Sequence, residues 1–202
     1  MSRDVERASA QFFGGRSCLD FANTLDWRAS DDPVELIPDY GSLLRWSERR
    51  GTLPRRAVRR LGRTHTLASS RAAMDDAYDL RSEIWAIAKA AGSGAPAPLG
   101  ALGQINRLLA SAPSQPPLVR DGSRYVHDLI GRDIREPLWP ILWSLSALMS
   151  SGDVNRIGLC SGTGCGWFFV DESPNRTRLW CSSSTCGNRE RARRAYARRQ
   201  RA

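Results

Sequence analysis

Residues 160–189 read CSGTGCGWFFVDESPNRTRLWCSSSTCGNR, and this window contains four of the chain's five cysteines. They form two close pairs, Cys160-x4-Cys165 and Cys181-x4-Cys186, with fifteen residues between them. Two such pairs can supply the four sulfur ligands that a structural Zn²⁺ ion takes at about 2.3 Å in tetrahedral geometry. We therefore predict one structural zinc ion, bound by Cys160, Cys165, Cys181 and Cys186. A catalytic zinc is not expected, because four cysteines close the coordination shell.

Other states of these cysteines stay open at the level of sequence. Two disulfides or four unconnected thiols are alternatives, although an odd cysteine count suits a reducing compartment better than a secreted disulfide framework. A zinc site that works as a redox switch is a further alternative, because thiolates near arginines are oxidisable.

The segment between the pairs predicts a hairpin. Aromatic and β-branched residues occupy 167–170, a turn sequence follows at 173–176, and 177–180 can return antiparallel to bring the second pair back to the first. Glycines within 162–166 allow a tight knuckle whose backbone N–H groups face the sulfurs. Good helix formers follow Cys186, so we expect a helix to begin there and its dipole to lower the pKa of that thiol.

This C-terminal helix is strongly basic. Residues 155–202 hold ten arginines and three acidic residues, and at helical spacing four of the arginines share one narrow stripe. Such a stripe can follow a phosphate backbone or read guanine edges, so we expect nucleic acid as partner, DNA ahead of RNA. A solvated end, or an acidic protein partner, stays open. Tyr196 is expected to pack back on the hairpin. The predicted nucleic-acid contacts are Arg189, Arg191, Arg194, Arg198 and Arg201.

The first three quarters of the chain show helical periodicity interrupted by loops. We expect a mostly helical α+β domain over residues 1–153, followed by the four-cysteine module over 154–202. Cys18, Trp139 and Trp143 are expected in the core. Helices are predicted from Ser17 to beyond Leu25, from Asp39 to Gly51, from Pro54, over 69–91, over 99–109 and from Pro137, with a β-hairpin at 118–127 around Asp121-Gly122.

Composition narrows the class of protein. The chain has 202 residues, 41% of them hydrophobic, which suits a folded core rather than disorder. It shows no apolar run of membrane-spanning length and no apolar signal-peptide core, so we expect a cytoplasmic protein without a membrane partner. Only Lys89 among the thirty basic residues is a lysine; a coding bias and a preference for bidentate phosphate contacts both fit that choice.

Two stretches resemble a known bacterial family, in which an ABATE domain of stress-induced transcription regulators precedes a CGNR zinc finger. The resemblance covers nearly the whole chain, although residues 50–115 match only in helical character. It implies a treble-clef-like finger and a role in transcription regulation and stress response. The residues that carry it are Cys160, Cys165, Trp167-Phe168-Phe169, Asp171, Arg176, Arg178, Trp180-Cys181 and Cys186-Gly187-Asn188-Arg189 in the finger, and Gly14-Gly15-Arg16, Cys18 to Arg28 and Val119 to Gly122 in the first domain.

The N-terminal signature places Asp20, Asn23, Asp26 and Arg28 close to a helix end. They fit either a buried capping network or a small-molecule sensor pocket. The two histidines have no paired acid or nucleophile in sequence reach, so we expect no enzyme. The leading hypothesis is a DNA-binding regulator whose first domain senses an effector or forms a homodimer; a zinc-stabilised protein-interaction module and an RNA-binding protein are the alternatives.

Overall fold

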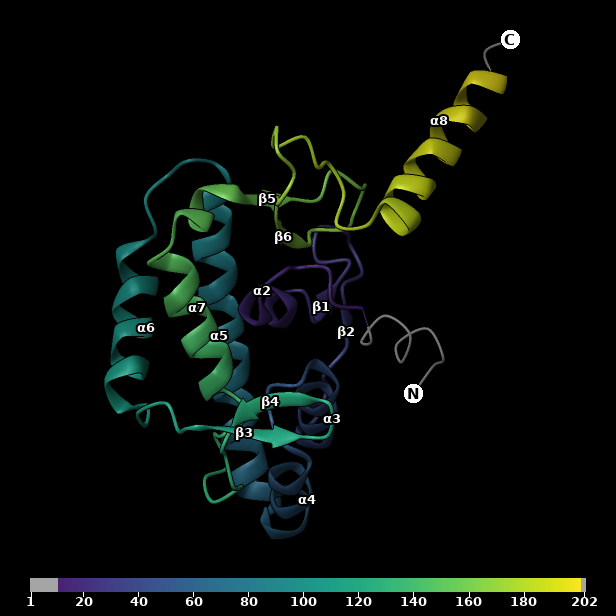
Figure 1. The fold of residues 1–202 in the computed structure, drawn as a ribbon. Coiled ribbons are helices and arrows are strands. Elements are labelled where there is room, and N and C mark those ends of the chain that lie inside the picture. The colour runs from purple at the N-terminus through teal and green to yellow at the C-terminus, as the bar shows by residue number, and fades with distance from the viewer. Residues whose placement is uncertain (1–10, 201–202) are drawn as a thin grey trace.

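The structure, a computed structural model, describes residues 11–200 (Figure 1). Within them, the predicted class is confirmed: helices dominate, and short strands pair antiparallel. The helices are α2 (Ser17–Ala22), α3 (Tyr40–Arg50), α4 (Arg55–Thr64), α5 (Leu67–Gly92), α6 (Leu99–Ser111), α7 (Trp139–Met149), α8 (Asn188–Arg199), the 3-10 helix η1 (Gly152–Arg156) and the π-helical turn η2 (Ser183–Gly187). The strand pairs are β1 (Leu25–Asp26) with β2 (Val34–Glu35), β3 (Leu118–Asp121) with β4 (Arg124–His127), and β5 (Ile157–Leu159) with β6 (Phe168–Val170).

Helix α5 is the longest helix and forms the axis of the molecule. Its 26 residues span about 39 Å at 1.5 Å per residue, and a capping box between Thr66 and Ser69 begins it. Ala73, Ala77 and Ile84 belong to its buried stripe, against which α2 and α6 pack while α7 covers α2 and α6 (Figure 1). Among residues 11–200, no helix combines the length and apolar content needed to cross a membrane.

The predicted helices are present with shifted ends. Asp39 caps α3 by accepting a hydrogen bond from Ser42 N at 2.6 Å, and Gly51, with φ of 77°, ends the helix. The hairpin turns at Gly122, with φ of 67°, as expected. Helix α2 is shorter than predicted: it ends at Ala22, and the chain leaves it so that Leu25 can pair in β1. Helix α7 begins at Trp139, two residues later than expected.

The predicted hairpin partner of residues 168–170 is wrong. Strand β6 pairs with the upstream strand β5, with Leu159 opposite Phe168 and Ile157 opposite Val170. The segment expected to return is instead a loop, because the Asp171 carboxylate accepts hydrogen bonds from the backbone N–H groups of Ser173 and Arg178 and closes it. A backbone hydrogen bond from Ser161 N to Leu179 O ties this segment to the first pair of cysteines.

Strand β6 joins two hydrophobic cores. Its alternating side chains place Phe168 and Val170 in the main core with the helices, and Phe169 in a second cluster with the four cysteines and Trp167. The predicted boundary between 153 and 154 falls inside η1, and the division into two domains stays a prediction. Physically, one strand serves the cores of both segments.

Buried polar contacts reinforce this junction. The Asn23 side-chain amide donates to Phe168 O at 2.9 Å and accepts from Phe168 N at 2.8 Å. Val170 N donates to Gly14 O at 3.0 Å. Because β6 is paired with β5 on only one side, these bonds satisfy backbone groups that would otherwise be buried without partners.

Replacing Asn23 with alanine tests this junction. The change leaves the buried N–H and C=O of Phe168 without partners, so Asn23→Ala should lower the free energy of unfolding by about 2–4 kcal/mol. Urea unfolding of the zinc-loaded protein measures the loss. Asn175→Ala, in the exposed loop, is the control and should change stability by no more than about 0.5 kcal/mol. Equal stabilities for the two variants would show that the Asn23 bonds contribute nothing.

Candidate metal centre and basic helix

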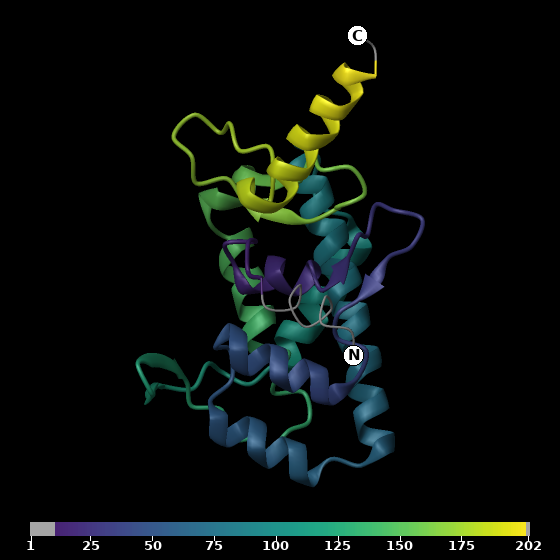
Figure 2. The ribbon, with the colours of Figure 1, turned by 90° about the vertical axis from the view of Figure 1, so that its right-hand side faces the viewer.

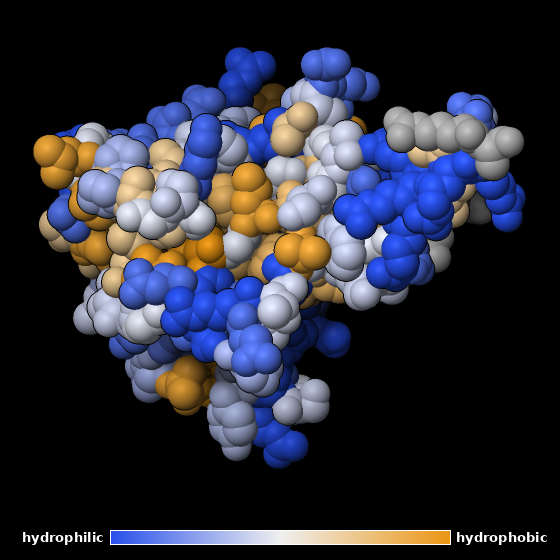
Figure 3. Space-filling model, turned by 90° about the horizontal axis from the view of Figure 1, so that it is seen from above, coloured by the Kyte–Doolittle hydropathy of each residue, from blue (hydrophilic) through white to orange (hydrophobic). Residues whose placement is uncertain are grey.

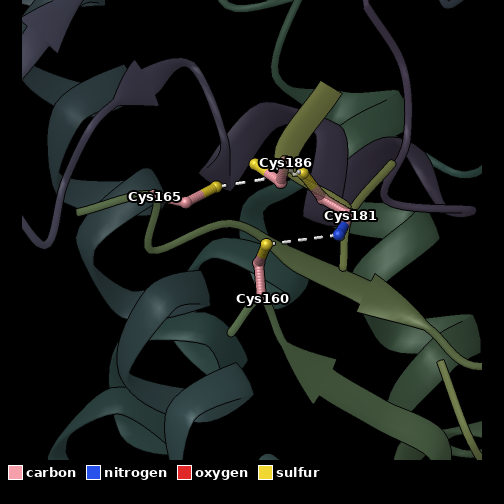
Figure 4. Close-up of side chains that lie close together, drawn as sticks. All are labelled: Cys160, Cys165, Cys181 and Cys186. Carbon is pink, nitrogen blue, oxygen red and sulfur yellow. Dashed lines mark hydrogen bonds between the residues drawn. The ribbon is translucent and has the colours of Figure 1, made fainter. Parts of the chain in front are cut away.

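Four cysteine sulfurs converge at one end of the molecule (Figure 4). All four residues are buried, and the sulfurs lie within 4.8 Å of one another. The Sγ atoms of Cys165 and Cys181 are 3.8 Å apart, and those of Cys181 and Cys186 are 3.5 Å apart. A tetrahedron with Zn–S bonds of about 2.3 Å has edges of about 3.8 Å. The spacing therefore fits four thiolates around one zinc ion.

Backbone N–H groups donate hydrogen bonds to the sulfur of Cys160. Gly162 N donates to Cys160 Sγ at 3.4 Å. Cys181 N donates to the same sulfur at 3.3 Å, as Figure 4 shows. Hydrogen bonds from Cys165, and then from Cys181 and Cys186, lower the pKa of Cys160 against the opposing effect of burial. The predicted N–H contacts are present at Cys160, and they stabilise the ligating form of the thiol.

Two glycines of the knuckle are required for contact with the N-terminal part of the chain. Gly164 and Gly166 have φ values of 76° and 72°, where side chains are disfavoured. A Cβ on Gly164 would lie 3.1 Å from the Trp27 ring, and one on Gly166 would lie 3.0 Å from Ala29 N. The turn between β1 and β2 therefore packs directly against the residues on either side of Cys165.

Arg189 contacts the metal centre, while its role in nucleic-acid binding stays a prediction. Its Nη2 donates to Cys186 Sγ at 3.0 Å, and its guanidinium lies 4.2 Å from the centre of the Trp27 ring. A cation beside a thiolate offsets part of the negative charge that four thiolates place around Zn²⁺. The indole face adds a cation–π contact, so Arg189 links the second cysteine pair to the N-terminal signature.

The four predicted pocket residues have separate environments. Asp20 is buried and accepts hydrogen bonds from Arg50 Nε at 2.7 Å and Gly14 N at 2.8 Å; burial nevertheless raises its pKa. Asn23 makes the junction described above. Arg28 lies 4.4 Å from the centre of the Trp85 ring.

Asp26 alone of the four lines the small cavity beside the cysteines, together with Trp27, Trp167 and Arg189. Burial raises the pKa of Asp26, and its carboxylate accepts a hydrogen bond from Trp27 N at 2.8 Å. The four residues are thus not gathered around one pocket. The capping-network alternative describes the surroundings of Asp20 and Asn23, whose polar groups contact protein.

Arg178 is a residue of the site that was absent from the predicted set. Its guanidinium donates to the carbonyl oxygens of Trp180 and Phe13 at 3.0 Å each and of Val170 at 3.2 Å, and to Cys181 O at 2.5 Å. It also lies 4.2 Å from the centre of the Phe169 ring. Arg178 therefore ties together the loop, β6 and the second cysteine pair, a role that a count of arginines cannot reveal.

Helix α8 leaves the body of the molecule from the metal centre (Figures 1 and 2). Cys186 lies in η2, which continues directly into α8, so the prediction of a helix beginning near this ligand is confirmed. In the first turn, Glu190 accepts a hydrogen bond from Thr163 N at 2.9 Å, which lowers the pKa of Glu190. The helix is thereby anchored at its first turn to both cysteine pairs.

The arginines of α8 differ in their partners. Arg191 is exposed, and its Nη2 donates to Ser183 O at 3.0 Å. Arg193 is also exposed and pairs with Glu190 at 3.6 Å. Arg194, Arg198 and Arg199 are exposed, and none has a carboxylate partner within residues 11–200. Figure 3 shows hydrophilic side chains gathered over the projecting helix. Arg199 was not in the predicted set because it lies off the stripe.

Arg201, the last of the predicted nucleic-acid contacts, lies outside the described residues. Tyr196 is 65% exposed and its hydroxyl accepts a hydrogen bond from Gln200 Nε2, so the expectation that it packs on a hairpin is wrong. Figures 1 and 2 show that α8 projects away from the rest of the described chain, and its main contact is with η2.

Comparison with known families identifies both parts of the chain. Residues 15–152 match the family model ABATE, described as "Putative stress-induced transcription regulator", and residues 156–199 match the model of the CGNR zinc finger. The first match ends at the first residue of η1, and the second begins at its last. No curated protein matches the chain. The finger match and the cysteine geometry together give one structural zinc ion held by four cysteines.

The zinc content gives a direct test. Purified, reduced protein should contain one zinc ion per chain, and Cys181→Ser should lose it together with the folded finger, because Trp167 and Trp180 pack on the cysteine cluster. Metal analysis and tryptophan fluorescence report the two losses. Cys18→Ala removes the remaining, non-ligating cysteine, which is buried in the helical core, and should keep the full zinc content. Zero zinc in the wild-type protein would refute the site.

Arg189 should tune the affinity for zinc without being a ligand. Arg189→Gln removes the cation beside Cys186, so zinc affinity should fall about 10- to 100-fold while the stoichiometry stays at one. Competition with a chromophoric chelator measures the affinity. Arg199→Gln removes the same charge from an exposed position of α8 and should leave the affinity unchanged. An unaltered affinity in Arg189→Gln would limit this side chain to packing on Trp27.

Proposed function

The chain belongs to the ABATE family of transcription regulators, with a C-terminal CGNR zinc finger, and we propose that it regulates transcription by binding DNA through α8. The observation that carries this proposal is the outward set of α8, namely Arg194, Arg198 and Arg199. These side chains are exposed on a projecting helix and lack carboxylate partners among residues 11–200. Guanidinium groups in this state can pair with phosphates without first breaking an ion pair.

The zinc site supports the proposal by orienting the helix. Cys186 and Glu190 hold the first turn of α8 to the rest of the finger, so the direction of the outward set follows from the metal centre. The zinc cluster itself is anionic: four thiolates and one Zn²⁺ sum to −2, which reduces the formal +7 of residues 155–202 to about +5. The module stays cationic, and most of its positive charge lies on the projecting helix rather than around the metal.

We assign the N-terminal domain a sensing or dimerising role. An apolar cavity between α5, α6 and α7, lined by Leu80, Leu108 and Trp139 and edged by the Asp76–Arg135 ion pair, offers a place for a small effector. Leu80 and Trp139 of its lining belong to the same hydrophobic core as Phe168 of β6. A ligand that repacks this core would act on β6, and β6 adjoins the metal centre. The proposal includes no catalytic activity.

Salt dependence of DNA binding tests the role of α8. Each phosphate contact contributes about −0.9 to the slope of log affinity against log salt. The triple variant Arg194→Gln, Arg198→Gln, Arg199→Gln should therefore bind more weakly and lose up to about 2.7 of the slope in fluorescence-anisotropy titrations with duplex DNA. Glutamine keeps the helix propensity. Arg107→Gln, on the exposed side of α6, is the control and should match the wild type.

Three results would count against parts of the proposal. An unchanged slope in the triple variant would remove α8 from the interface. Tighter binding of single-stranded or duplex RNA than of DNA would make the protein an RNA-binding regulator. No retention on any nucleic acid at low salt would leave α8 as a surface for an acidic protein partner.

A further inference from the structure

A second cationic surface lies on α4, whose sequence is RRAVRRLGRT. Ala57 and Leu61 are its buried residues and face the core. At about 100° per residue, all five arginines of the helix fall within an arc of about 140° on the opposite side. The apolar side of this ten-residue helix is therefore covered by the protein. Every charged residue on its other side is an arginine. The arginines are Arg55, Arg56, Arg59, Arg60 and Arg63.

Acidic neighbours neutralise only part of this face. Arg55 pairs with Glu48 at 3.4 Å, and Arg56 pairs with Asp128. Arg59, Arg60 and Arg63, which we call the α4 triad, are exposed and have no carboxylate partner within the described chain. The triad thus resembles the outward set of α8 in composition, exposure and lack of ion pairs.

The α4 triad is remote from the finger. Helix α5 begins three residues after Thr64, the last residue of α4, and its other end lies at the finger, where Gly92 approaches Ile157 O. The length of α5, about 39 Å, therefore separates the end of α4 from the base of the finger. Figures 1 and 2 both show α4 and α8 at opposite ends of the molecule. At this distance, the α4 triad and α8 cannot contact the same short segment of nucleic acid.

We infer that the α4 triad is a second phosphate-binding surface, which contacts a nucleic-acid backbone independently of α8. The inference rests on the proposed function, because it takes the same partner. Arginine favours phosphate through bidentate hydrogen bonds, and backbone contacts of this kind position a protein without reading sequence. A lipid surface suits the helix less well, because a membrane-bound amphipathic helix inserts its apolar side. Here Ala57 and Leu61 on that side are already buried in the protein.

Substitution of the triad in the zinc-loaded, full-length protein tests the inference. The variant Arg59→Gln, Arg60→Gln, Arg63→Gln should weaken binding to a duplex of random sequence and reduce the salt slope by about 0.9 for each contact, up to about 2.7. Each single variant should show about one third of that change, whereas Arg107→Gln should show none. Circular dichroism and zinc content should match the wild type, since the substituted side chains are exposed.

The α8 triple variant separates failure of this inference from failure of the proposed function. Loss of binding in both triple variants supports both surfaces. Loss in the α8 variant alone overturns the inference and leaves the proposed function standing. Loss in the α4 variant alone supports the α4 triad as a binding surface and removes α8 from the interface, which overturns the proposed function. A wild-type protein that binds no nucleic acid at low salt overturns both. If the α4 variant loses binding to anionic phosphatidylserine vesicles and keeps full nucleic-acid affinity, the partner of the triad is a membrane.

Discussion

Four buried thiolates around one zinc ion hold the last quarter of this protein in place. The described part of that segment has the strand pair β5–β6 and a small hydrophobic cluster. The four cysteines are part of that cluster. Without the metal, mutual repulsion would prevent four ionised sulfurs from sharing this volume, and four protonated thiols would offer only weak hydrogen bonds. The knuckle, the 171–178 loop and the first turn of α8 all depend on that coordination for their relative positions.

The metal centre also depends on the N-terminal part of the chain. Trp27 packs against Gly164 and under the guanidinium of Arg189, and Asn23 completes the hydrogen bonds of β6. The finger therefore packs on the helical part of the chain through residues that lie next to its zinc ligands. A displacement of the turn between β1 and β2 would therefore act directly on the zinc site and on Arg189 in the first turn of α8.

Arginines serve two opposite purposes in this molecule. Arg178 and Arg189 are partly buried and donate to carbonyl oxygens and to a sulfur of the protein. The outward set of α8 and the α4 triad leave their donors in solvent, where they can meet phosphates. Both kinds of arginine occur within a few residues of one another in the sequence. Their roles follow from which side of the helix or loop faces the protein.

The sequence by itself determined the ligand set, because the spacing of two cysteine pairs is meaningful for a tetrahedral ion in any fold. It also predicted the main helices and the hairpin at Asp121-Gly122, since periodicity, caps and turn residues act over a few positions. The partner of β6 was beyond its reach, because a strand of three residues can pair with any nearby edge. Tertiary structure alone decided that pairing, the inward turn of Arg189 and the separation of the two basic surfaces, since each depends on contacts between residues far apart in the chain.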